Sequence, residues 1–410
     1  MVLALNHTSW VLVVLMLLSI NTIPSRSNEG MLSTEPEYWP TTGWHTSTPE
    51  AQGMNAQLID DMDEYINAHS WPLHAFLIIR NGYIVYEYYA ASYDQGILHY
   101  LASATKSFTS ALIGIALREG HVGSLDDRVV DIFDDRTIAN LDARKQAMTV
   151  EHLLTMTAGL TWDSTHGFAQ MMSSPDWVQY VLDLPMATNP GETWVYNSGA
   201  SHLLSAIIQQ LSGTTTIDFA ETRLFQPLGI NNYWWELDPD GIPNGGAGLL
   251  LTPRDMAKLG LLYLEEGRWD DQRILSADYV AASSEISANL VLSPEGDPES
   301  GYGYQFWIYP PLDAYAAHGG GGQIILVVPE RELVIVTTAN DFSSQVPLTD
   351  LLLDYIYPSI DGAANPSPII PWLGEILLVL AFGIPLVTLV VYFVTKRRKL
   401  SKFQTGLKGE

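Results

Sequence analysis

The segment Ser103-Ala-Thr-Lys106 decides how this chain is interpreted, because it places a serine hydroxyl and a lysine amine one helical turn apart. Apolar residues follow it at helical spacing, and Gly120 is a suitable end signal; the spaced residues are Phe108, Leu112, Ile115 and Ala116. Residues three apart share a helix face, so the amine can reach the hydroxyl and help remove its proton. This is the minimal machinery of a serine–lysine acyl-transfer enzyme.

A serine followed three residues later by a lysine is a short motif, so its context must support the interpretation. The structural alternative is an N-capping serine followed by an exposed lysine. Only three lysines precede residue 396, namely Lys106, Lys145 and Lys258. A lysine three residues after a serine is therefore less expected by chance in this part of the chain. A buried helix start would also supply backbone N–H groups and a positive dipole end, which favour an oxyanion and a neutral lysine.

Composition and charge limit the partners and the kinds of site that we expect for this chain. The tail from Lys396 holds six of the 20 basic residues and one of the 46 acidic residues, which leaves 14 basic and 45 acidic residues, a net charge of −31, for residues 1–395. Such a surface repels nucleic acid, so we expect no nucleic-acid partner. The chain has no cysteine and no closely spaced His/Asp/Glu set. We therefore expect neither disulfides nor a metal site, and no cofactor.

The two ends of the chain indicate a membrane protein. Residues 1–27 combine the apolar run Val11–Ile20 with Ser25-Arg26-Ser27, which is typical of a signal peptide, although the absence of Lys and Arg from the first ten residues leaves an uncleaved anchor open. Residues 361–371 read as a linker, 372–395 as a transmembrane helix and 396–410 as a basic cytoplasmic tail. We expect a single-pass protein of the cell membrane with residues 28–360 outside the cytoplasm; its oligomeric state stays open.

Strand patterns occur near both ends of this body. Ala75–Arg80 and Tyr83–Tyr89 are joined by Asn81-Gly82, a two-residue hairpin turn, and strand patterns return at Tyr304–Tyr309, Gln323–Val328 and Leu333–Thr338. The middle is mainly helical, with amphipathic pieces at Ser201–Leu211 and Pro253–Leu264. The pattern predicts an α/β (α+β) domain: an antiparallel sheet from N- and C-terminal strands, flanked by helices, with a large all-helical insertion at about 126–300.

Two further segments bear on chemistry. Pro190–Gly199 delivers Tyr196 just ahead of a helix, and a phenol beside a lysine ammonium can serve as a base. The alternative is that Tyr196 is one of 20 tyrosines and that Asn197 and Ser198 only cap the next helix. The run His318-Gly-Gly-Gly-Gly-Gln lets substrate approach the backbone and an N–H point at an oxyanion; the alternative is a flexible hairpin turn.

Together these segments resemble the β-lactamase-like and penicillin-binding-protein-like serine hydrolases, especially the branch of class C β-lactamases, esterases and 6-aminohexanoate-dimer hydrolases. The similarity extends from about Gly53 to Ile356, and besides Ser103-x-x-Lys106 it rests on Met148–Leu160, Pro190–Ser198, Gly245–Asp255 and His318–Gly320. The resemblance implies a β-lactamase/transpeptidase-like fold. It also implies Ser103 as nucleophile, Lys106 as its partner amine and Tyr196 as general base and acid. The backbone N–H groups of Ser103 and Gly321 would form the oxyanion hole, and no metal or organic cofactor is required.

The chain departs from this family pattern at two substrate-facing positions. In the family's second motif, which corresponds to Tyr196–Ser198, asparagine usually stands at the position of Ser198. The third motif, which corresponds to His318–Gly320, usually begins with lysine, and here it begins with His318. Histidine is largely neutral at pH 7, so a permanent cation for a substrate carboxylate is missing. The sequence therefore favours a neutral ester or short amide as substrate. Two alternatives stay open: a D-Ala-D-Ala carboxypeptidase or β-lactamase, and a non-catalytic, membrane-anchored binding protein on the same scaffold.

Overall fold

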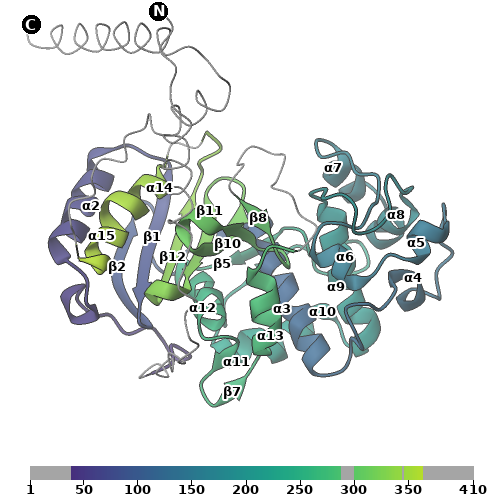
Figure 1. Cartoon of the computed structure of the whole chain (residues 1–410), viewed down its shortest axis with the longest axis horizontal. Coiled ribbons are helices and arrows are strands. Elements are labelled where there is room, and N and C mark those ends of the chain that lie inside the picture. Colours follow the sequence, from purple (N-terminus) through teal and green to yellow (C-terminus); the bar gives the residue numbers. More distant parts are fainter. Residues whose placement is uncertain (1–37, 288–299, 344–345, 363–410) are drawn as a thin grey trace, which may run out of the picture. The chain divides into compact units, whose positions relative to one another are not determined.

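Strands from both ends of the folded body form one antiparallel sheet. The computed structural model describes residues 38–287, 300–343 and 346–362, and its main sheet has the strand order β2-β1-β12-β11-β10-β9-β8 (Figure 1). The strands are β1 (Leu73–Arg80), β2 (Tyr83–Tyr89), β8 (Gly301–Tyr302), β9 (Trp307–Tyr309), β10 (Ala314–Gly319), β11 (Gln323–Val328) and β12 (Leu333–Ala339). Every pairing within it is antiparallel, which confirms the predicted α/β (α+β) sheet made from N- and C-terminal strands.

The β1–β2 hairpin forms where the sequence predicts it. Asn81 and Gly82 have φ angles of 51° and 79°, and positive φ at both positions is what a type I′ turn requires. Strand β10, in contrast, was not predicted. Its sequence Ala-Tyr-Ala-Ala-His-Gly carries small residues and a glycine in place of the branched side chains that identify strands.

Helices cover both faces of the sheet, and alternate residues of β1 enter separate apolar clusters. Phe76 and Ile78 pack with Met62 of α2 (Ala56–Ala68) and with the C-terminal helices α14 (Leu348–Leu351) and α15 (Tyr357–Asp361). Leu77 and Ile79 belong to the larger cluster that contains α3 (Thr105–Arg118) and α12 (Pro253–Leu264). The period of two along a strand thus gives the sheet two buried faces.

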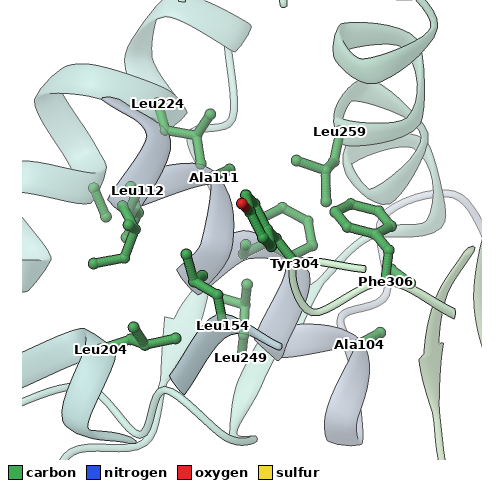
Figure 2. Close-up of a cluster of buried hydrophobic side chains, with 14 of the residues drawn as sticks. Ala104, Ala111, Leu112, Leu154, Leu204, Leu224, Leu249, Leu259, Tyr304 and Phe306 are labelled. Atoms are coloured by element: carbon green, nitrogen blue, oxygen red, sulfur yellow. The ribbon is translucent and has the colours of Figure 1, made fainter. Parts of the chain in front are cut away.

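Helix α3 forms the centre of this larger cluster. Every residue from Thr105 to Ala116 is buried, so the helix is enclosed on all sides. Figure 2 shows Ala111 and Leu112 of α3 among side chains from several elements: Leu154, Leu204, Leu224, Leu249, Leu259, Tyr304 and Phe306. The first turn of α3, which carries Lys106, is therefore fixed by packing along the whole helix.

The middle of the chain is mainly helical, but the prediction of an all-helical insertion is wrong at two points. It contributes β5 (Leu249–Leu251) and β4 (Trp234–Trp235) to a short sheet with β3 (His99–Tyr100), which precedes the region, and it contains a hairpin of β6 (Arg268–Trp269) and β7 (Gln272–Arg273). Strands of two or three residues are too short to show a period of two. Helix α12, moreover, packs on the main sheet, where Gly260 faces Val334 and Ile325.

The remaining helices lie in this region or connect the strands. They are α4 (Val129–Ile132), α5 (Ala143–Gln146), α6 (Val150–Leu154), α7 (Gly167–Met172), α8 (Trp177–Asp183), α9 (Ser198–Ser212), α10 (Thr216–Ala220), α11 (Gln226–Leu228) and α13 (Ala277–Ser284). Short 3₁₀ turns occur at η1 (Glu50–Gln52), η2 (Ala102–Ala104), η4 (Pro310–Leu312) and η5 (Pro329–Arg331), and π-helical turns at η3 (Glu221–Phe225) and η6 (Leu352–Ile356).

The predicted signal peptide or anchor at 1–27, most of the linker at 361–371, the transmembrane helix at 372–395 and the tail at 396–410 lie outside the described residues. Within residues 38–287, 300–343 and 346–362, no helix is both long and apolar enough to span a bilayer.

The packing of α12 on the sheet gives a first prediction. A Cβ at Gly260 would lie 2.5 Å from Cγ1 of Val334 and 3.0 Å from Cγ2 of Ile325. We expect Gly260→Ala to lower the free energy of unfolding by about 1 to 3 kcal/mol through overpacking, measured by urea denaturation. Gly96→Ala is the control, because its Cβ would meet only Asp94 at an ordinary 3.4 Å. Equal stabilities of the two variants would contradict the close packing of α12.

Candidate functional site

Ser103 lies at a sharply turned chain segment directly ahead of α3. It belongs to η2, and the preceding Ala102 has a φ of 46°, in the left-handed region that a non-glycine residue rarely adopts. The N–H of Leu101 donates to the carbonyl of Leu249 at 2.9 Å, which ties this segment to β5. The predicted helix start at Ser103 is therefore present, and it is held by the short sheet that sequence analysis missed.

Lys106 is buried in the first turn of α3, with 1% of its surface exposed. Its Nζ atom contacts three oxygens: Oγ of Ser103 at 3.2 Å, Oγ of Ser198 at 3.0 Å and the carbonyl of Gly246 at 2.6 Å. None of these oxygens belongs to a carboxylate. Burial without a compensating anion disfavours the ammonium and lowers the pKa of Lys106 from its ordinary 10.5 to about 7. The structural alternative, an exposed lysine after a capping serine, is thereby excluded.

The count of donors at Lys106 Nζ favours proton transfer from Ser103. A neutral amine has two N–H groups and one lone pair, and the carbonyl of Gly246 can only accept. If Nζ donates to Gly246 and to Ser198, its lone pair faces the hydroxyl of Ser103. After protonation the same three contacts become three donated hydrogen bonds. The site therefore satisfies the nitrogen in both protonation states.

The carbonyl of Gly246 reaches Lys106 because a glycine segment passes between α3 and α9. A Cβ at Gly245 would lie 2.2 Å from the carbonyl oxygen of Ser201, and one at Gly246 would lie 2.8 Å from that of Ser198. The N–H of Gly246 donates to Oδ1 of Asn244 at 3.1 Å, which orients the peptide. Sequence analysis did not assign Gly246 to the site. The run Gly-Gly-Ala-Gly at 245–248 was the signal available.

In the second motif, the adjacent residues Tyr196, Asn197 and Ser198 make different contacts. Oδ1 of Asn197 caps α9 by accepting from the N–H groups of Gly199 and Ala200, at 2.8 and 3.1 Å. This matches the structural alternative for Asn197. The hydroxyl of Ser198 is instead directed to Lys106, and the ring of Tyr196 lies beside the same amine, with its centroid 4.8 Å from Nζ. Both predicted residues therefore reach the site.

Aromatic rings form one wall beside Tyr196. Its ring centroid lies 6.0 Å from those of Trp194 and Trp307 and 6.4 Å from that of Tyr302. Tyr302 and Trp194 are buried, whereas Tyr196 and Trp307 are partly exposed. Tyr196 is consequently bordered by aromatic rings.

In the third motif, which begins at His318, the residue that approaches Ser103 is Gly319, which sequence analysis did not select as a site residue. A Cβ at Gly319, the last residue of β10, would lie 2.1 Å from the carbonyl oxygen of Leu101 and 3.1 Å from the N atom of Ser103. Gly320 and Gly321 follow in the turn to β11, and Gly321 has a φ of 83°. Their backbone therefore forms a hairpin turn, which is the structural alternative given for this run in the sequence analysis. Within this motif, Gly319 makes the closest approach to the segment that carries Ser103.

His318 faces away from Ser103, because neighbouring residues of a strand point to opposite sides. Its Nδ1 lies 3.2 Å from the hydroxyl of Tyr309, and it pairs across the sheet with Ile324 of β11. Desolvation lowers the pKa of His318 below its ordinary 6.5, which keeps the imidazole neutral at pH 7. The structure brings Ser103, Lys106, Tyr196 and Ser198 together. His318 lies on the other side of β10 from Ser103, and its ring centroid is 6.3 Å from that of Trp307 in the aromatic wall beside Tyr196.

A buried glutamine connects the helices that carry these groups. Gln305 accepts a hydrogen bond at its backbone carbonyl from Ser107 of α3 and at Oε1 from Ser201 of α9, both at 2.7 Å. Its Nε2 donates to the carbonyls of Leu153 and Leu154 in α6 at 3.1 and 2.7 Å. Gln305 therefore fixes α3 and α9 relative to α6 from behind the site. No sequence pattern distinguishes it from other glutamines.

The lowered pKa of Lys106 predicts the pH dependence of acylation. If its neutral amine receives the proton of Ser103, the second-order rate constant for acylation rises with pH through about 7 and levels off above it. Stopped-flow measurement with a chromogenic ester would show this limb, and Lys106→Met should abolish it. A rate that stays flat from pH 5 to 9 would contradict the role of the amine.

The contact of Gly319 predicts a loss of activity from one added methyl group. Gly319→Ala must push β10 away from η2, and a displacement of about 1 Å costs roughly 10²-fold in rate. We expect kcat/KM to fall by that order while the circular dichroism spectrum is retained. Gly96→Ala serves again as control, and equal activity of the two variants would show that the contact is unimportant.

Comparison with known proteins agrees with this geometry. The family model described as Beta-lactamase matches residues 56–354. A 6-aminohexanoate-dimer hydrolase of Paenarthrobacter ureafaciens is 22% identical, over 65% of this chain and 72% of its own. A Beta-lactamase of Escherichia coli is 25% identical, over 60% of this chain and 76% of its own. The crystal structure of a family VIII carboxylesterase superposes with a TM-score of 0.62 at 16% identity, over 77% of this chain and 98% of its own, which confirms the predicted fold. Because the family model covers most of the chain, the protein belongs to the beta-lactamase family of serine hydrolases.

Proposed function

We propose that Ser103 is the nucleophile of a hydrolase that cleaves neutral carboxylic esters or short amides through an acyl-enzyme. The observation that carries this proposal is the buried amine of Lys106, which lies 3.2 Å from the hydroxyl of Ser103 and contacts only neutral oxygens. An amine with a pKa of about 7 is half neutral at physiological pH, which suits a general base. A serine beside such a base is the usual signature of an activated nucleophile.

In the first step, Ser103 Oγ forms a bond to the carbonyl carbon of the substrate while its proton passes to Lys106 Nζ. Collapse of the tetrahedral intermediate breaks the bond to the leaving alkoxide or amine, which departs with a proton from the Lys106/Tyr196 pair. Water then forms a bond to the acyl carbon as the Lys106/Tyr196 pair takes its proton; the bond from Ser103 Oγ to that carbon breaks, the carboxylic acid is released, and the proton returns to Ser103 Oγ. The N–H groups of Ser103 and Gly321 are proposed to stabilise the oxyanion, with Gly320 forming part of the same turn.

Ser198 offers a second route for the proton, since its hydroxyl lies 3.0 Å from Lys106 Nζ. If Tyr196 protonates the leaving group, Tyr196→Phe should lower kcat by about 10²- to 10⁴-fold, whereas Ser198→Ala should cost clearly less. If Ser198 is the donor, the order is reversed. Single-turnover kinetics of acylation with an ester of a poor leaving group would separate the two roles, because such a leaving group needs the proton most.

The preference for a neutral substrate rests on charge. His318 is neutral at pH 7 and faces away from Ser103, so it provides no cation for a substrate carboxylate. Relatives named Beta-lactamase and Putative D-alanyl-D-alanine carboxypeptidase keep hydrolysis of a β-lactam or a peptide as the second candidate. Covalent labelling by a fluorescent penicillin would favour that candidate over the esterase.

Location is a separate proposal that depends on the sequence. The apolar stretch at 372–395 and the basic residues at 396–399 support attachment to the cell membrane, with the catalytic body outside the cytoplasm and the C-terminus inside. Fractionation of cells with and without residues 372–410 tests it. A full-length chain that remains in the supernatant after membranes are sedimented would contradict the proposal.

The hydrolase proposal makes a direct labelling prediction. A fluorophosphonate should add covalently to the wild-type protein and not to Ser103→Ala, detected by intact mass. Ser173→Ala, an exposed serine in α7's C-cap position, is the matched control and should label like wild type. Absence of labelling in a folded wild-type protein would instead favour a non-catalytic binding protein.

A further inference from the structure

A large cavity lies against the face of the sheet opposite the nucleophile. It has a volume of about 1000 Å³, which is within the range of pockets that hold drug-sized ligands. Its lining includes apolar side chains from the sheet, from η4 and from the C-terminal helices, among them Leu73, Leu312, Ile324, Leu326, Val346 and Leu352. Neither Ser103, Lys106, Tyr196 nor Ser198 lines it, so the cavity is distinct from the catalytic groups.

The cavity nevertheless adjoins the site at the end of β10. His318, Ile324 and Thr337 stand in register across β10, β11 and β12, and all three line the cavity. The next residue, Gly319, points the other way and abuts Ser103. Gly320, Gly321 and Gly322, which continue the chain, form part of the cavity wall. One turn of backbone therefore separates the nucleophile from the cavity.

The end of β10 lies at an edge that β9 does not cover. In the described part of the chain, β9 pairs with β10 only at residues 314–316, so the last residues of β10 have no partner strand on that side. The glycines of the turn carry no side chains of their own; the ring of Phe342, which is 80% exposed, lies near Gly320 and Gly321, and the side chains of Gln323, Ala339 and Asp341 lie near Gly321 and Gly322.

The charge of the lining restricts the ligand. The cavity contains the carboxylates of Asp341 and Asp350 and no lysine or arginine among its described lining residues. Its other polar groups include the neutral His318 with the hydroxyl of Tyr309 and the hydroxyl of Thr337, which already donates to the carbonyl of Gly322 at 2.9 Å. Such a cavity repels fatty-acid carboxylates and phosphates and accepts an uncharged apolar chain.

We propose that this cavity binds the apolar chain of a neutral ester whose carbonyl lies at Ser103. The proposal rests on the proposed function and names its substrate class: esters with an extended aliphatic or aryl-aliphatic chain, on the acyl or the alcohol side. Each methylene that enters the cavity leaves water and adds to transition-state binding. The enzyme then selects long neutral esters over short ones.

Kinetics with two ester series test the proposal. One series varies the acyl chain of p-nitrophenyl esters from acetate through butyrate and octanoate to dodecanoate; the other varies the alcohol of acetate esters in the same way. For wild type, kcat/KM should rise with chain length in one of the series. Ile324→Trp and Leu312→Trp, which fill the cavity from two elements, should reduce kcat/KM for the longest esters by roughly tenfold, as expected from losing about two buried methylenes. Turnover of p-nitrophenyl acetate by both filling variants should stay within about twofold of wild type.

The control is Leu141→Trp, an equally large change at an exposed position that does not line the cavity. It should leave the chain-length profile unchanged. Wild-type turnover with a chain-length profile that neither filling variant alters would overturn the cavity proposal while leaving the hydrolase intact.

A binding measurement separates failure of the cavity from failure of catalysis. The neutral fluorophore N-phenylnaphthylamine should bind wild type and Ser103→Ala alike, be displaced by methyl octanoate more effectively than by octanoate anion, and bind both filling variants at least tenfold more weakly. If Ser103-dependent turnover is absent and this binding persists, the proposed hydrolase function is wrong, whereas the binding of neutral apolar ligands in the cavity is supported. Equal binding of the fluorophore to wild type and to both filling variants would refute the proposal that the cavity binds apolar ligands.

Discussion

The burial of one amine, that of Lys106, is the constraint on which the rest of the site depends. An ammonium removed from water without an anionic partner is unfavourable, and this cost lowers the pKa of Lys106 to about 7. The fold could have removed the cost by placing a carboxylate beside the amine. It supplies two hydroxyls and a carbonyl instead, which hold the nitrogen in place without restoring its charge. A lowered pKa of this kind is what the proposed role of Lys106 as a base requires.

Close packing of backbone around α3 maintains this arrangement. The helix is buried through Ala116, and glycine segments approach it and η2 from two sides, where any side chain would collide. Gly246 brings a carbonyl to Lys106, and Gly319 brings β10 to Ser103. Gln305 joins α3, α6 and α9 from behind. The positions of Ser103 and Lys106 are thus determined by contacts between segments far apart in the sequence.

The parts of this account that sequence analysis could predict are those with a local signal. The β1–β2 hairpin, α9, α12 and the serine–lysine pair each depend on spacing within a few residues, and all are present. The positions of Gly319, Gly246 and Gln305 depend on contacts between segments many residues apart, which no local pattern encodes. His318 illustrates the difference most clearly. Its motif was recognisable, but the alternation of β10, a strand that was not predicted, turns its side chain toward the cavity instead of Ser103.

The ionisation of Lys106 is the most direct test of this account. Only seven lysines occur in the chain, so selective carbon labelling of lysine and comparison with Lys106→Met should assign its ε-carbon resonance in a nuclear magnetic resonance spectrum. Titration of that resonance should give a pKa of about 7. A pKa near the ordinary value of 10.5 would show that Lys106 is an ammonium at neutral pH, and would contradict its assignment as the base that activates Ser103.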